Sequence, residues 1–182
     1  MPRYHPFLVA LHWLMALMIL VALAAGRLLL ANMPPESPDK IAALGGHMVF
    51  GMAIGVLLVL RLVTRLRSTH PPHAPTGNAV LDRIGVWTHW AFYALIGGMV
   101  MTGLAMIFGA VLFPIVYGGA AEILPPGLQD LPQREAHGLI ATALVALIAL
   151  HVAAALWHQF ARKDGLLRRM WFGKRSTDEP AK

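Results

Sequence analysis

The 182-residue chain contains no cysteine. This absence excludes disulfides, iron–sulfur clusters and thioether-linked haem, each of which requires cysteine sulfur. Charge is also scarce, because only 13% of the residues are charged and the nine acidic residues are outnumbered by fifteen Lys and Arg. Any metal chemistry in this chain must therefore rely on its nine histidines.

Hydrophobic residues make up 57% of the chain, more than a soluble domain of this size needs. Four segments are long and apolar enough to cross a bilayer as helices: 7–30, 47–66, 86–108 and 136–161. The first is not read as a signal peptide, because its apolar run is too long and continues through Arg27 into further leucines. The sequence predicts an all-α membrane protein, a four-helix bundle that forms one domain over 1–182.

The two remaining long segments lie outside the predicted spans. Residues 109–133 contain glycine and proline pairs among apolar residues, which predicts an outer cap with a short interfacial helix. Residues 162–182 begin with RKDGLLRRMWFGKR, a basic and partly amphipathic sequence. We expect this tail to lie on the inner leaflet, where anionic headgroups attract it.

The distribution of positive charge predicts the orientation in the membrane. One side holds only three cations, Arg27, Lys40 and Arg134. The other side holds Arg3, Arg61, Arg65, Arg67, Arg83, Arg162, Lys163, Arg168, Arg169, Lys174, Arg175 and Lys182. By the positive-inside rule we expect a bacterial inner-membrane protein with both termini in the cytoplasm. The net charge of +6 then reflects topology and contact with lipid, and gives no reason to expect a nucleic-acid partner.

Four histidines lie within the predicted spans at positions suited to metal binding. His137 and His151 are fourteen residues apart in the fourth segment, which on a helix places them on one face with roughly 21 Å of rise between them. His12 lies in the first segment and His47 in the second. Ionisable side chains inside a bilayer are costly and usually functional. Four imidazoles supply two axial pairs, so the sequence predicts two b-type haems enclosed by the bundle.

Depth along the helices indicates how these histidines pair. His47 and His137 both stand at the outer beginnings of their segments and are expected to share an outer haem. His12 lies near the inner end, where its partner could be His151 or His158. Measured from the charged residue Arg162, His158 matches the depth of His12 better, yet it lies nearer the surface. Sequence geometry alone leaves this choice open.

The order of these motifs resembles the prokaryotic cytochrome b561 family over nearly the whole chain. The resemblance rests on His12-Trp13, His47, His137, and the segment HVAAALWH (151–158) followed by KDGLLRRM (163–170). More loosely, the chain is similar to the cytochrome b subunits of membrane hydrogenases and formate dehydrogenases. The resemblance implies that His47 and His137 bind the outer haem and that His12 and His151 bind the inner one. It also makes His158 a candidate for a quinone pocket or a propionate contact.

His89 stands between aromatic residues at the cytoplasmic start of the third segment. It could ligate iron, contact a haem propionate, line a quinone pocket or bond a neighbouring helix. No side chain is assigned a catalytic role from the sequence.

The resemblance also implies an oxidoreductase that moves electrons between a periplasmic donor, with superoxide favoured, and ubiquinone. Arg134 and Lys40 are candidates to attract the outer anion or to bind a propionate. Because the outer loops carry a net charge of minus two, such attraction must be local. The alternative is a haem-bearing membrane anchor that relays electrons for a separate redox protein, with the outer cap as its docking face.

Overall fold

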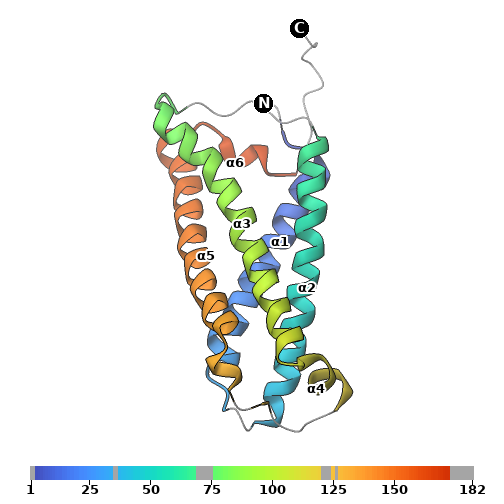
Figure 1. Cartoon of the computed structure of the whole chain (residues 1–182). Coiled ribbons are helices and arrows are strands. Elements are labelled where there is room, and N and C mark those ends of the chain that lie inside the picture. Colours follow the sequence, from blue (N-terminus) through green and yellow to red (C-terminus); the bar gives the residue numbers. More distant parts are fainter. Residues whose placement is uncertain (1–2, 35–36, 69–75, 120–123, 126, 173–182) are drawn as a thin grey trace.

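The computed structural model describes residues 3–34, 37–68, 76–119, 124–125 and 127–172, and every regular element in these ranges is helical. Four long helices form the bundle (Figure 1). They are α1 (Pro6–Ala24) with its π-helical continuation η1 (Ala25–Leu30), α2 (Pro38–Arg67), α3 (Ala79–Gly109), and α5 (Pro132–Trp157) with its π-helical continuation η3 (His158–Arg162). Each is long and apolar enough to cross a membrane, so the predicted all-α bundle is confirmed.

The starts of three helices lie earlier than the sequence predicted. Helix α2 begins at Pro38, before the predicted span at 47 and before Ile41, the earliest start that the sequence allowed. Helix α3 begins at Ala79 instead of 86, and α5 at Pro132 instead of 136. Proline suits the first turn of α2 and α5, and the Asn78 side chain accepts hydrogen bonds from two backbone N–H groups of α3. Hydropathy marks only the bilayer-crossing part of a helix, whereas these capping features determine where it begins.

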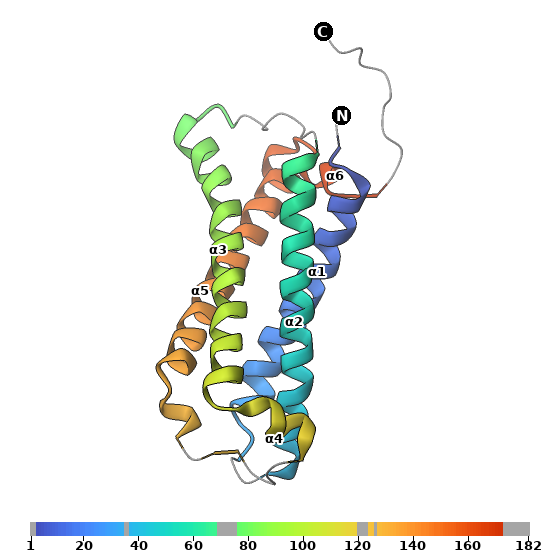
Figure 2. The same cartoon turned by 45° about the vertical axis from the view of Figure 1, so that its right-hand side comes forward.

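The four helices pack as two pairs. Helix α1 packs on α2, α3 packs on α5, and the pairs meet mainly through α2 and α3 (Figure 2). A buried core joins all four helices at mid-height and consists of Met15, Ile19, Ile54, Ile96 and Leu144. Large apolar side chains are exposed on the outside of every long helix, among them Leu17, Val56, Met101 and Leu150. These outer faces are suited to lipid contact.

The end of the bundle that was predicted to face outwards carries two short helices, α4 (Leu112–Gly118) and the 3₁₀ turn η2 (Leu128–Asp130). The Tyr117 hydroxyl donates a hydrogen bond of 2.9 Å to the Gly45 carbonyl and so fixes α4 to α2. A short helix was predicted in this cap, and α4 occupies that part of the chain. Residues 120–123 and 126 of the cap lie outside the described residues.

At the opposite end, the short helix α6 (Leu166–Arg169) follows η3 and crosses from α5 towards α1 (Figure 1). Indole Nε1 of Trp13 donates to the Met170 carbonyl at 2.7 Å, and the Tyr4 N–H donates to the Arg169 carbonyl at 3.2 Å. The described part of the predicted basic tail therefore closes this end of the bundle. Residues 173–182 lie outside the described residues.

Candidate functional site

Two predicted site histidines face each other at the end of the bundle that was predicted to face outwards, called the outer end below. The ring centres of His47 on α2 and His137 on α5 are 6.2 Å apart, and the ring planes are inclined at 71°. Two imidazoles bound on opposite sides of one metal ion have their ring centres roughly 6 Å apart. The spacing of this pair therefore suits axial ligation from two helices that belong to different packed pairs.

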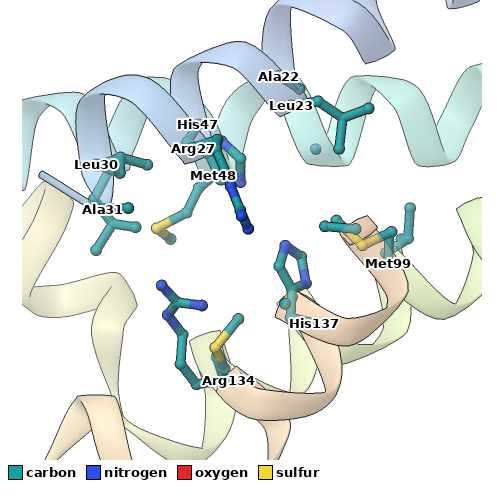
Figure 3. Close-up of a pocket in the computed structure, with 18 of the residues that line it drawn as sticks. Ala22, Leu23, Arg27, Leu30, Ala31, His47, Met48, Met99, Arg134 and His137 are labelled. Carbon is teal, nitrogen blue, oxygen red and sulfur yellow. The ribbon is translucent and has the colours of Figure 1, made fainter. Parts of the chain in front are cut away.

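A cavity of about 600 Å³ surrounds this outer pair, and both histidines line it (Figure 3). Its size falls within the range of roughly 300–1,000 Å³ typical of cofactor pockets. The described residues of its wall are mostly apolar, with three cations, Arg27, Lys40 and Arg134, and no acidic residue among them. In Figure 3 the side chains of Arg27 and Arg134 point into the same space as the two imidazoles.

Glycines leave room in this cavity for a flat group. A Cβ atom added at Gly51 would meet nothing within 4 Å, whereas one at Gly26 would lie 3.5 Å from Cε1 of His47. The buried Nδ1 of His47 has no hydrogen-bond partner among the described residues. An apolar pocket with two facing imidazoles and nearby cations fits haem, whose rim carries carboxylates. The residues present therefore fit this cofactor.

Lys40 differs from the two arginines of the cavity. It is the only buried charged residue in the described part of the chain, with 6% of its surface exposed. Its ammonium group donates a hydrogen bond of 2.7 Å to the Met33 carbonyl, beyond the end of η1. Lys40 therefore also anchors the segment that joins α1 to α2.

Three histidines meet near the other end of the bundle. The ring centre of His151 on α5 lies 6.4 Å from that of His12 on α1 and 6.0 Å from that of His89 on α3. Phe92 packs edge-on against the same ring at 5.3 Å. Nδ1 of His89 lies 2.7 Å from the Gly85 carbonyl, which can only accept, so this nitrogen carries a hydrogen. The structure thus brings His12 from α1 and His89 from α3 to His151 on α5.

His158 has a different environment from these three residues. His158 is the first residue of η3, and its Nδ1 lies 2.5 Å from Oδ2 of Asp164. The same carboxylate oxygen accepts a hydrogen bond of 3.3 Å from Nε of Arg162. The predicted candidates His89 and His158 therefore occupy separate surroundings, one beside His151 and one in a polar group at the end of α5.

An apolar layer separates the two histidine groups. Leu144 lies seven residues from both His137 and His151, about two helical turns or roughly 10 Å from each. Ile19 and Ile54 likewise follow His12 and His47 by seven residues, and all three apolar side chains belong to the buried core. The four helices therefore present histidine at two levels with packed hydrocarbon between them.

Sequence reasoning missed two side chains, one that contacts His137 and one that bonds to the helix carrying His12. The Thr102 hydroxyl lies 2.9 Å from Nδ1 of His137, but a threonine within an apolar helix gives no signal of such a role. Arg61 was counted only as a topology marker. Its guanidinium donates to the carbonyl of Leu8, four residues before His12 on α1, at 3.0 Å.

Paired histidines at two levels of a membrane-crossing helical bundle, without cysteine for covalent attachment, are typical of membrane-bound b-type cytochromes. The family model for prokaryotic cytochrome b561 matches residues 3–173, and the chain belongs to this family. It is therefore a multi-pass membrane protein of electron transport, and its family binds b-type haem. The predicted family is confirmed.

Three relatives are similar to this chain over nearly their whole lengths. The chain is 29% identical over 178 residues to the probable superoxide oxidase CybB of Yersinia pestis, covering 95% of this chain and 98% of that one. It is 29% identical over 180 residues to cytochrome b561 homolog 2 of Escherichia coli (strain K12), covering 97% and 94%. Cytochrome b561 homolog 1 of the same organism is 24% identical over 172 residues, covering 93% and 97%.

Proposed function

We propose that this chain carries electrons across the bacterial inner membrane through two haem b groups, from superoxide at the outer face to ubiquinone at the cytoplasmic face. The observation that carries the proposal is the meeting of histidines in two groups, with ring centres 6.2 and 6.4 Å apart, on either side of an apolar layer. The excess of cations beside the termini supports the assignment of that end to the cytoplasm.

Four histidines serve as axial ligands in this proposal. His47 and His137 hold the outer haem, and His12 and His151 hold the inner one. Bound haem supplies one-electron chemistry through its iron. If these histidines hold the haems in pairs, each iron would have no position left for dioxygen, which would favour electron transfer over oxygen chemistry. Since α5 contributes to both pairs, it keeps the two sites at a constant separation.

Superoxide is the proposed donor on the outer side. Arg27 and Arg134 turn positive charge towards the cavity, and Lys40 adds a third cation to its wall. This local charge favours an anion despite the acidic outer loops. Each superoxide loses one electron and leaves as neutral dioxygen, which the cations no longer attract. The similarity to the Yersinia pestis relative, a probable superoxide oxidase, supports this choice.

Ubiquinone is the proposed acceptor near the cytoplasmic end. Its reduction to ubiquinol takes two electrons, from two superoxide anions, and two protons. His158 is the candidate to contact the quinone and deliver a proton, because Asp164 holds its Nδ1 and leaves Nε2 for a ligand. His89, next to His151, is the second candidate for a quinone or propionate contact.

Haem counting on purified variants tests the ligand assignment. We expect wild-type protein to hold two haems and to show the reversible absorbance change of a b-type cytochrome. His137→Ala removes the outer haem and His151→Ala the inner one, so each variant keeps about half the pigment. His5→Ala, which changes an exposed histidine before α1, is the control and keeps both. Full pigment in the His151→Ala protein would move the inner assignment to His158.

The reaction itself is tested with the purified two-haem protein and ubiquinone in lipid vesicles. A steady source of superoxide is expected to produce ubiquinol, and superoxide dismutase is expected to abolish that product. If superoxide gives no ubiquinol while a copurifying redox protein reduces the haems, the chain is instead an electron-relay anchor for that partner.

A further inference from the structure

The hydroxyl of Thr102 links α3 to His137 on α5. Its Oγ1 lies 2.9 Å from Nδ1 of His137, and it also lies 2.8 Å from the Gly98 carbonyl and 3.1 Å from the Met99 carbonyl. The threonine therefore has three partners close enough for hydrogen bonds. It has only one hydrogen to donate.

The backbone takes this single hydrogen. In three other long-helix threonines, Thr64, Thr88 and Thr142, the hydroxyl donates to the carbonyl four residues earlier, at 2.7–3.0 Å. The contact from Thr102 to Gly98 repeats this geometry at 2.8 Å. With its hydrogen directed to the helix backbone, Thr102 can only accept from the imidazole. The hydrogen-bond network thus assigns His137 the tautomer with hydrogen on Nδ1, which leaves Nε2 as the lone-pair donor.

Glycines on α3 make this contact possible. A Cβ atom added at Gly98 would approach Cδ1 of Ile140 to 3.2 Å, and one at Gly103 would lie 3.7 Å from Cε1 of His137. The absence of side chains at these positions lets α3 and α5 come close together. The short hydroxyl of Thr102 therefore reaches the ring.

The facing imidazole of His47 is held differently. Its Nδ1 is buried and has no hydrogen-bond partner among the described residues, although its ring centre is only 6.2 Å from that of His137. The two outer histidines therefore differ in the groups around Nδ1. One donates to a fixed hydroxyl, and the other has no fixed acceptor in the described part of the chain.

We propose that Thr102 is a positioning residue which fixes His137 as the stronger of the two ligands of the outer haem. The inference rests on the proposed assignment of His137. Donation from Nδ1–H to an acceptor orients the ring and raises the basicity of Nε2. A more basic ligand stabilises ferric over ferrous iron, so Thr102 holds down the reduction potential of the outer site. The inner site has no such contribution from Thr102.

The experiment uses full-length protein in detergent, with Thr102→Val and Thr102→Ala removing the hydroxyl and Thr102→Ser retaining it. Reduction potentials of both haems are measured by spectroelectrochemical titration, together with haem content and the rate at which haem is lost to an acceptor protein. Thr64→Val on α2 removes a hydroxyl that donates to the Leu60 carbonyl of its own helix, and serves as the control.

The valine and alanine variants are expected to raise the outer potential and leave the inner one unchanged. They are also expected to lose the outer haem about tenfold faster, in line with the usual effect of removing a partner of a metal ligand. Thr102→Ser and Thr64→Val should behave as wild type. Unchanged outer potentials in both hydroxyl-free variants, or a serine variant altered as strongly as they are, would overturn the role of Thr102. A wild-type protein without an outer haem would instead overturn the proposed function.

Discussion

Nδ1 of His158 lies 2.5 Å from Oδ2 of Asp164, across a reversal of the chain at the end of α5. Lys163 makes this reversal possible because its backbone is left-handed, with φ of 54°. The second carboxylate oxygen accepts a hydrogen bond of 3.1 Å from the Leu166 N–H, at the start of α6. Asp164 therefore connects the candidate quinone residue to the segment that closes the end proposed to face the cytoplasm.

This connection predicts that Asp164 supports quinone reduction through His158. A carboxylate that accepts from Nδ1–H fixes the orientation of the ring, and an amide fixes it less well. Asp164→Asn should lower the rate of ubiquinone reduction about tenfold. This is less than the roughly 10²-fold or more by which a positioned proton donor speeds a reaction, because His158 itself is still present. His158→Ala should lower it further, and haem content should stay at the wild-type value in both. Loss of a haem from either variant would count against a quinone role and point to a ligand or propionate contact.

The ionisation of Asp164 predicts how this end of the bundle responds to acid. Partial burial raises the pKa of Asp164, but hydrogen bonds from His158, the Leu166 N–H and Arg162 outweigh it, so the pKa lies below its usual value. The stabilisation is therefore complete above the unfolded pKa of about 3.9 and is lost as the pH falls through the lower folded value. Thermal unfolding of wild type and Asp164→Asn should differ at about pH 7 and 5 and coincide well below pH 4. A difference that persists unchanged in strong acid would contradict this ionic role.

In the inner histidine group, substitutions of the two histidines beside His151 are expected to have different outcomes. The ring centres of His12 and His89 lie 6.4 and 6.0 Å from that of His151, close to the roughly 6 Å between two imidazoles on one metal ion. We expect His12→Ala to remove the inner haem, because His12 is the assigned ligand, and His89→Ala to keep it. Haem counting and the spectrum of the remaining haem check this. Retention of both haems in the His12→Ala protein, with loss of one in His89→Ala, would reassign the ligand to α3.

Much of this arrangement could be predicted from the sequence, because helical periodicity places residues fourteen apart on one face. That rule located His137 and His151 at two depths of one helix, and the structure has both facing histidines of other helices. Depth on one helix does not give depth on another, because tertiary packing sets their relative shift. For that reason the spacing from Arg162 left the choice between His151 and His158 open.

The missed residues have a related explanation. Thr102 contributes only because glycines on α3 allow close approach to α5, and no local pattern reports which helices will be neighbours. The starts of α2 and α3 were placed too late because apolar runs indicate the bilayer-crossing part, while Asn78 and the prolines set the first turns. Sequence patterns thus specify faces and lengths well and specify contacts between helices poorly.

The cations of the outer cavity predict a charge-dependent reaction with superoxide. Arg27 and Arg134 point into the cavity, and no acidic residue is among its described lining. Neutralising either, as Arg27→Gln or Arg134→Gln, should lower the rate of haem reduction by superoxide up to about tenfold and flatten its dependence on salt. Reduction by an uncharged donor should be unaffected. Arg83→Gln, near the start of α3, makes the same charge change away from the cavity and should react as wild type. If the arginine variants lose the outer haem, these side chains bind its propionates; if rate and haem content both stay unchanged, the cavity charge has no part in donor capture.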